Sequence, residues 1–340
     1  MDLNKRKSIS YAKYGYLFIL PFFIVYLFFQ IYPLCYTFYL STQSNGDLVT
    51  ESVGIDNFKI LVGGQATTTP GHEIAGRAAK SAKQNFGRVL KNTVLLWGGN
   101  FIPQIIISLL LAAWFTDAYL KVKGKGFYKI VMYMPNIITA ASVAALFVML
   151  FSDTEYGAVN NLLVKLGKER VNFVSGVKGE ARIMIMIIQT WMWFGNTTIM
   201  LMSGIMGINP SLFEAANIDG ATPTQQFFKI TIPLLRPIML YTVVTSMIGG
   251  LQMFDIPYLY NAQAGAQNQT TETVAVFIYN NFHKTTQPNL GYSAAASVIL
   301  FFITVALGSI AFVTNKEEDP RSAHAKNMKK TALKQKLGGL

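Results

Sequence analysis

The sequence predicts an all-α, polytopic membrane protein with six transmembrane helices. Of its 340 residues, 51 % are hydrophobic and only 14 % are charged, whereas about a quarter of the residues in a soluble domain are charged. Charged residues are also absent from six long windows, which are residues 14–46, 92–116, 130–152, 183–213, 237–254 and 285–315. Because a helix of about 20 mainly apolar residues crosses the hydrocarbon layer, each window is a candidate span.

The first window follows Lys5, Arg6 and Lys7, an order that also begins a secretory signal peptide. The apolar run is about twice as long as a signal-peptide core, and no small-residue cleavage site follows it. We therefore predict a span that stays in the protein. Before the second window, residues 73–91 are rich in alanine and basic residues and predict a short helix that leads into the second span.

The predicted spans contain polar residues and prolines. In hydrocarbon, polar side chains face the bundle interior or water. Taken singly, each is explained by an ordinary hydrogen bond between helices, but together they indicate a polar path. The polar residues are Asn100, Gln104, Asn136, Gln189, Asn196, Gln252 and Asp255. Local breaks in the helical backbone are expected at Pro21, Pro103, Pro135 and Pro257.

Lys and Arg are distributed unevenly between the two sets of connecting segments. The N-terminus 1–13, loops 118–129 and 208–236, and the tail 316–340 hold 17 of them in 79 residues. The loops 41–91, 152–182 and 262–290 hold 12 in 111 residues. By the positive-inside rule the first set is cytoplasmic. We expect a six-helix domain over residues 14–315, with both termini and the basic tail in the cytoplasm and three outer loops.

Composition argues against several other classes of function. A net charge of +12 would suggest nucleic acid in a soluble chain, but here topology explains the excess and we expect no nucleic-acid partner. The histidines His72, His283 and His324 are far apart, so no metal site or catalytic group is predicted. The two Gly-Lys dipeptides at 124–125 and 167–168 lack the rest of a phosphate-binding loop. If the chain takes part in uphill transport, another subunit must supply the energy.

The segment 209–237, on the predicted cytoplasmic side, is the most informative. Asn209 is a good N-cap, with Pro210 at the first helical position, and Gly220 is placed to end the helix. Thr222 and Pro223 repeat the start signal. We expect two short surface helices, after which Pro233 and Pro237 turn the chain back into the membrane.

Small and apolar side chains make this segment suitable for docking to a soluble subunit. Ala215, Ala216 and Gly220 allow close approach, and Leu212, Phe213, Phe227 and Phe228 supply apolar area. The alternative is a plain amphipathic helix that lies on lipid.

Residues 214–235, EAANIDGATPTQQFFKITIPLL, resemble the Glu-Ala-Ala loop of the membrane subunits of binding-protein-dependent ABC importers. Four further segments are similar to the carbohydrate-uptake subfamily, to which maltose and glycerol-3-phosphate importers belong: residues 53–58, 91–93, 254–258 and 291–295. Residues 261–265 depart from the Thr-x-Gly-Gly-Pro usual there. The matches in the loop are Glu214, Ala215, Ala216, Gly220, Ile230 and Pro233, with Ile232 in place of leucine.

This resemblance implies a coupling helix from Glu214 to Gly220 that sits in a cleft of a cytoplasmic ATPase. It assigns coupling to Glu214, Ala215, Ala216, Asp219, Gly220 and Pro233. The implied partners are a homologous second permease in a heterodimer, an ATPase dimer that holds ATP and Mg, and an external solute-binding protein. The chain itself would be a multi-pass, non-catalytic subunit in the bacterial plasma membrane, with no cofactor and no metal.

A sugar site needs aromatic surfaces and a few amide or carboxylate partners. The fourth and fifth spans supply both, where the family's substrate contacts fall, and Gly249 and Gly250 would leave space. For the two tryptophans, interfacial anchoring or helix packing is the alternative. The candidates are Gln189, Trp191, Trp193, Asn196, Gly250, Gln252, Met253 and Asp255.

Two alternatives to a sugar importer remain open from the sequence. The first is an importer for another solute, such as a polyamine or a phosphate ester. The second is a membrane receptor or scaffold with working outer loops, which leaves the loop at Glu214 unexplained.

Overall fold

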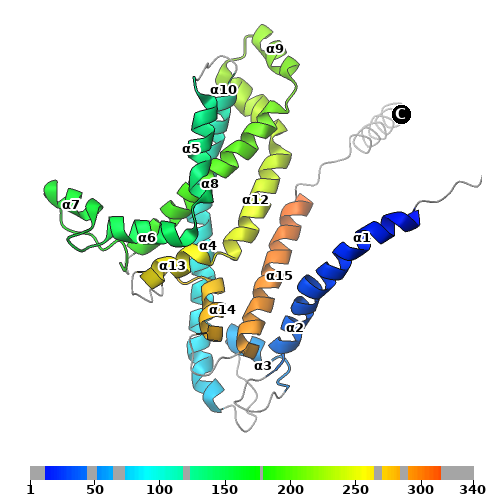
Figure 1. The fold of residues 1–340 in the computed structure, drawn as a ribbon, viewed down its shortest axis with the longest axis vertical. Helices are drawn as coiled ribbons and strands as arrows, with labels where there is room; N and C mark the ends of the chain where they lie inside the picture. The colour runs from blue at the N-terminus through cyan, green and yellow to red at the C-terminus, as the bar shows by residue number, and fades with distance from the viewer. Residues whose placement is uncertain are drawn as a thin grey trace, which may run out of the picture. The chain divides into compact units, whose positions relative to one another are not determined.

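The computed structural model describes residues 12–43, 52–63, 73–117, 123–176, 179–263, 270–283 and 290–314 (Figure 1). These residues are predominantly helical and contain no strand beyond one isolated bridge between Gln43 and Ser52. The helices are α1 (Ala12–Tyr26), the π-helical turn η1 (Leu27–Ile31), α2 (Tyr32–Ser41), α3 (Asp56–Val62), α4 (Glu73–Thr116), α5 (Lys125–Ile137), α6 (Ala140–Phe151), α7 (Ala158–Lys165), α8 (Glu180–Met206), α9 (Pro210–Ile218), α10 (Pro223–Gln226), the π-helical turn η2 (Phe227–Thr231), α11 (Ile232–Leu234), α12 (Arg236–Leu251), α13 (Asp255–Gln263), α14 (Val274–His283) and α15 (Leu290–Thr314).

Five helical segments in the described part of the chain are long and apolar enough to cross a membrane, and the bent pair α5 and α6 is the sixth if it crosses as one broken span. The prediction of an all-α protein with six spans is confirmed. The basic tail 316–340 lies outside the described residues. The five segments are Tyr14–Ser41, Phe86–Thr116, Glu180–Met206, Arg236–Ala262 and Leu290–Val313.

The chain divides into two compact units. The first comprises residues 1–93 and 267–302, and the second comprises residues 94–266 and 303–340. The helix expected over 73–91 does not end before the second span, because α4 runs without a break from Glu73 to Thr116. Both α4 and α15 contribute residues to both units.

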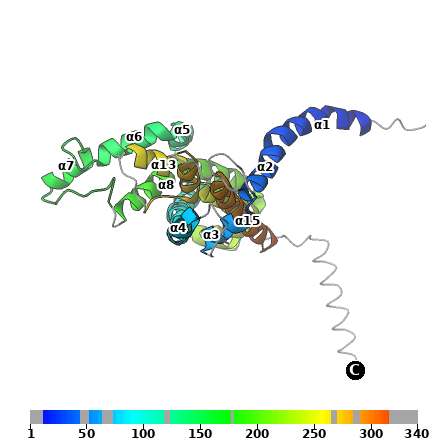
Figure 2. The same cartoon turned by 90° about the horizontal axis from the view of Figure 1, so that it is seen from below.

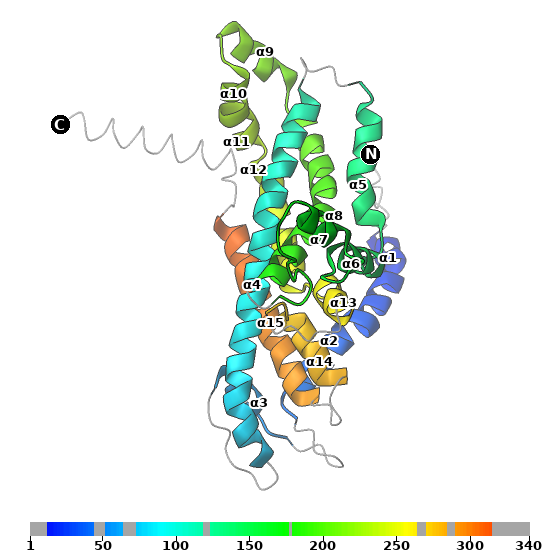
Figure 3. The same ribbon diagram turned by 90° about the vertical axis from the view of Figure 1, so that its left-hand side faces the viewer.

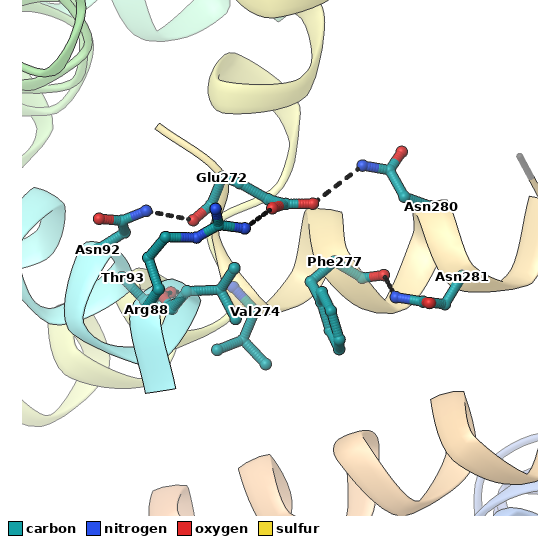
Figure 4. A network of polar contacts seen from close by, with 9 residues as sticks. Arg88, Asn92, Thr93, Glu272, Val274, Phe277, Asn280 and Asn281 are labelled. Carbon is teal, nitrogen blue, oxygen red and sulfur yellow. Dashed lines mark hydrogen bonds and ion pairs between the residues drawn. The ribbon is translucent and has the colours of Figure 1, made fainter. Parts of the chain in front are cut away.

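In the first unit, a polar network fixes α14 to the N-terminal half of α4 (Figure 4). Arg88 Nη2 lies 3.1 Å from Glu272 Oε2, and Asn280 Nδ2 donates to Glu272 Oε1 at 3.3 Å. Asn92 Nδ2 donates to the Glu272 carbonyl, and the Val274 N–H donates to Thr93 Oγ1 at 2.9 Å. The predicted outer loop 262–290 therefore contains an anchored helix, which its sequence did not indicate.

A second contact of the first unit joins the end of α2 to α3. Asn57 Nδ2 donates to the carbonyls of Ser41 and Gln43, both at 2.9 Å. Gly291, at the start of α15, packs against the Gln43 carbonyl, where a Cβ would clash. Asn57, Asn92, Thr93 and Gly291 all belong to the sequence segments that resemble the carbohydrate-uptake subfamily, so those segments serve packing in this unit.

The second unit contains a sharp break in the third span. Helices α5 and α6 are bent by 93°, because Ile138 and Thr139 between them have extended backbone conformations. Thr139 Oγ1 then caps α6 by accepting from the Ser142 N–H at 3.4 Å. Helix α5 packs on α8, whereas α6 packs on α13 (Figure 2). The sequence located a break near Pro135 but not the size of the bend.

Helix α8 is the centre of the second unit. Gly195 packs directly against the Met132 carbonyl of α5, so a side chain has no room there. On another side, Gln104 Nε2 of α4 donates to Thr197 Oγ1 at 2.7 Å, and both residues are buried. The two polar groups can be buried because each satisfies the hydrogen-bonding capacity of the other. These contacts hold α4 and α5 close to α8, and α4 and α8 border the site described next.

Candidate functional site

A cavity of about 570 Å³ lies within the second unit, between α4, α8, α12 and the segment that joins α12 to α13. This volume is in the range of small-molecule sites, about 300–1,000 Å³. Seven of the eight substrate-path candidates line this cavity. The sequence predicted these candidates only as a group along two spans. They are Gln189, Trp193, Asn196, Gly250, Gln252, Met253 and Asp255.

Trp191 is the candidate that the structure does not bring to the cavity. Its ring packs against Phe147 of α6, with ring centroids 5.6 Å apart. Two residues along a helix turn the side chain by about 200°, so Trp191 and Trp193 face opposite sides of α8. For Trp191 the alternative interpretation, helix packing, describes what the structure shows.

The sequence did not predict that α4 forms a wall of the cavity, although Asn100 and Gln104 were among its polar residues within the spans. Trp97, Asn100 and Gln104 line the cavity, and their spacing of three and four residues puts them on one helix face. The cavity-lining residues Tyr241, Thr245 and Gly249 on α12 are likewise spaced by four residues. The helical spacing of these residues was the available signal, but α4 and α12 had to be known as neighbours before it could be used.

Gly250 has a different role from the predicted one. It does not leave space for a ligand, because the ring of Trp97 packs against it and a Cβ there would clash with that ring. Trp97 Nε1 donates to Ser246 Oγ at 3.2 Å, and the ring stacks on Phe101 at 5.8 Å. Gly250 thus allows α12 to approach α4 closely. Gly249 beside it does face open space.

The cavity offers polar groups that the protein itself does not use. Among the described residues, the side-chain amides of Gln189, Asn196 and Gln252 form no hydrogen bond with another protein group. Trp193 is 46 % exposed and lines the cavity. An indole surface beside three unused amides can bind a molecule that has both apolar faces and hydroxyl groups.

The predicted coupling segment forms one end of the second unit, where α9 and α10 are connected by a tight turn (Figure 3). Asn209 Oδ1 caps α9 by accepting from the Ser211 N–H at 3.1 Å. Gly220 has φ +72°, a conformation that favours glycine. Asn217 Oδ1 accepts from Gln226 Nε2 at 2.6 Å and holds the turn.

Helix α9 has no buried residue. Ile218 is 86 % exposed and Leu212 is 44 % exposed, and Glu214 and Ala215 are also exposed, with Ala216 partly so. Asp219 is the C-cap residue of α9. Apolar and acidic side chains therefore stand together on a projecting helix, a surface composition that is typical of a protein contact.

The second short helix differs from the prediction. Thr222 begins a helical segment with a capping box, as expected. That segment then continues through α10, η2 and α11 into α12 instead of lying separately on the membrane surface. Pro233 is at the start of α11 and Pro237 at the start of α12, where the first turn of a helix tolerates proline. Both prolines therefore lie within helical segments, and Pro233 belongs to α11 and not to α9.

Residues 104–317 match the family model described as "binding-protein-dependent transport system inner membrane component". The chain is 27 % identical to the lactose transport system permease protein LacF of Rhizobium radiobacter, over 93 % of this chain and 99 % of LacF. It is also 27 % identical to the trehalose/maltose transport system permease protein MalF of Thermococcus litoralis, over 90 % and 95 %. A crystal structure of a bacterial alginate ABC transporter, in complex with an alginate pentasaccharide-bound periplasmic protein, contains a chain with a TM-score of 0.73 and 24 % identity, over 91 % and 96 %.

Proposed function

Because this chain belongs to the family of binding-protein-dependent transport system inner membrane components, we propose that it is the permease subunit of an ABC importer for a sugar or oligosaccharide. It is a multi-pass protein of a bacterial plasma membrane. In this proposal its spans form the path of the solute, which an external solute-binding protein delivers.

The observation that carries the proposal is the composition of the cavity wall. Trp193 presents an indole, and Gln189, Asn196 and Gln252 present amides that have no protein partner among the described residues. Sugars combine apolar C–H faces with hydroxyl rims, so this wall matches their chemistry. The sugar-transport names of the full-length relatives support the same class of solute.

The chain carries no energy source of its own in this proposal. A separate ATPase dimer binds ATP and Mg and receives α9 through Glu214, Ala215, Ala216, Asp219 and Gly220. A homologous second permease completes the membrane path in a heterodimer. ATP-driven closure of the ATPases then shifts the permease pair between its inward-open and outward-open states.

Reconstitution tests the proposal. The full chain, co-purified with the second permease and the ATPase that assemble with it, is placed in vesicles with ATP inside and the solute-binding protein outside. We expect uptake of a labelled oligosaccharide that stops when ATP is withheld. Vesicles with the complex but without binding protein are the control. Uptake of a labelled polyamine or phosphate ester in place of every sugar would contradict the sugar assignment.

The orientation of the chain is part of the proposal, with both termini and α9 in the cytoplasm. Cys35 is the chain's single cysteine. In a Cys35→Ser background, each introduced cysteine is therefore the only thiol of the chain that can be labelled. In intact cells, a membrane-impermeant maleimide is expected to label Glu155→Cys and not Thr224→Cys, although both positions are exposed. Permeabilised cells should label both. The reverse pattern in intact cells would invert the topology.

A further inference from the structure

The second unit has a lateral arm, which consists of α6, α7 and the turn between them, residues 140–166. The sequence predicted that the part from residue 152 onward belongs to an outer loop. In the structure α6 and α7 extend sideways from α8, and α7 is the farther of the two (Figures 1 and 2). Because α6 is bent by 93° from α5, it runs parallel to the membrane plane when α5 crosses along the membrane normal.

A contact with α8 sets the depth at which the arm leaves the unit. Phe147 of α6 packs on Trp191 of α8. Measured back from Gly207, where α8 ends, about 30 Å of hydrocarbon corresponds to about 20 residues and reaches about Ile187. Trp191 is four residues further in, so the arm begins about 6 Å inside the boundary of the leaflet opposite α9. Helices that lie in a membrane interface are buried to a depth of about 5–10 Å.

Helix α6 has one face buried in protein and one face uncovered. Val143 and Ala144 are buried, and Phe147 and Phe151 pack against the same core cluster as Val143. The uncovered face contains no charged side chain, and its residues recur at helical spacing. It can therefore lie among acyl chains. The exposed residues of this face are Ser142, Ala145, Leu146 and Met149.

Helix α7 and its ends present an apolar face with a basic edge. Ala158, Leu162 and Leu166 are spaced by four residues and exposed, Leu162 to 58 % and Leu166 to 65 %. Lys165 is exposed next to them, and a lysine can keep its stem on apolar surface while its charge reaches the lipid phosphates. Tyr156, in the turn before α7, is 85 % exposed, and tyrosine is enriched at membrane interfaces.

A buried asparagine fixes which side of α7 is uncovered. The Asn160 side chain donates from Nδ2 to the carbonyls of Ser152 and Val171, at 2.8 and 2.9 Å, and its Oδ1 accepts from the Val171 N–H at 2.8 Å. Gly157 packs against the Ser152 carbonyl, where a Cβ has no room. The polar side of α7 is thus tied to the end of α6 and to the returning chain. The apolar face is a fixed feature of this fold.

We propose that the arm lies in the lipid interface of the leaflet opposite α9, with Met149 and Leu162 among the acyl chains and Lys165 at the phosphates. This inference goes beyond the proposed function and uses it only to name the leaflet, which is the outer one. Burial of these apolar side chains in lipid is favourable. A solute-binding protein would have to dock and leave in each transport cycle, and lasting interfaces are the more hydrophobic ones. A continuous apolar face therefore fits lipid better than that partner.

Collision measurements on spin labels test the proposal. In the assembled transporter in lipid vesicles, with Cys35→Ser, a nitroxide is attached to Met149→Cys or Leu162→Cys. Its collision rates are measured with oxygen, which concentrates in acyl chains, and with a polar nickel chelate, which stays in water. Glu155→Cys is the matched control, since Glu155 is exposed in the turn of the same arm. We expect an oxygen-to-nickel collision ratio at least about tenfold higher at Met149→Cys and Leu162→Cys than at Glu155→Cys, because hydrocarbon excludes polar solutes.

Three results would overturn the proposal. Nickel collisions at Leu162→Cys as frequent as at Glu155→Cys would place α7 in water. Nickel collisions that disappear only when loaded solute-binding protein is added would assign the face to that protein. Infrequent collisions with both reagents in its absence would assign the face to the second permease. If Leu162→Cys does not assemble, Leu166→Cys reports on the same face. The collision ratio does not depend on solute uptake, so a transporter that imports no sugar would refute the proposed function and leave this result readable.

Discussion

Gly220→Pro and Glu214→Lys are each expected to abolish ATP-driven uptake while the protein still inserts and assembles in the membrane. Gly220 has φ +72°, whereas proline requires φ near −65°. Its N–H also donates to the Asn217 carbonyl at 3.0 Å, a bond that proline cannot make. The turn that orients α9 would therefore change. Glu214→Lys leaves the backbone intact and reverses the charge on the exposed face of α9.

The expected size of the loss of uptake follows from the proposed role of α9 as a docking element. Loss of a central contact residue in an interface costs about 2 kcal/mol or more, which corresponds to about a 30-fold loss of productive contact. Uptake and the ATPase stimulation by loaded solute-binding protein should fall together in reconstituted vesicles. A variant that loses uptake but keeps full stimulation would place the defect in the solute path instead.

Gly167→Pro is a matched control for the backbone effect. Gly167 has φ +75° and its N–H donates to the Val164 carbonyl at 3.0 Å, almost the same geometry as at Gly220. It ends α7, in the predicted outer loop 152–182, far from α9 in the sequence. Stimulation should persist in this variant. If both Gly220→Pro and Glu214→Lys retain normal stimulation, α9 is not the docking element.

The start and end of α9 could be predicted from the sequence because their signals are local. Asn209 and Gly220 act through their own backbone conformation and nearest hydrogen bonds, and both have the predicted geometry. The continuation of α10 into α12 was missed because proline is compatible with both a turn and the first turn of a helix. Which of the two forms depends on packing around residues 227–237, including the buried Leu235.

The cavity shows the same division between local and non-local information. The side of α8 that carries Gln189, Trp193 and Asn196 follows from helical spacing alone. That Trp97 forms the opposite wall depends on the close approach of α4 to α12 at Gly250, a contact between residues about 150 positions apart. The 93° bend between α5 and α6 is likewise set by what each half packs against, α8 and α13. Spacing in one span cannot contain this information.

The double variant Gln189→Ala with Trp193→Ala is expected to reduce solute transport strongly while ATPase stimulation by loaded binding protein persists. A stacked aromatic face contributes about 0.5–1.5 kcal/mol, and a hydrogen bond from a buried amide about 1–1.5 kcal/mol. Together they amount to about 1.5–3 kcal/mol, or about a 10- to 150-fold loss of occupancy. Since a transport site binds its solute briefly, such a loss leaves little productive transfer.

Ile187→Ala with Trp191→Ala is the matched control for this pair, with the same spacing and a comparable loss of side-chain volume on α8. Ile187 is 48 % exposed and Trp191 packs on Phe147, and neither lines the cavity. The control should transport normally if the helix remains folded, which the assembly of the complex on gel filtration checks. Stimulated ATP hydrolysis without solute movement in the first double variant alone would assign the solute to the face of α8 that carries Gln189 and Trp193. Unchanged transport in that variant would mean that these side chains only pack, and that the solute binds on α12 or on the second permease.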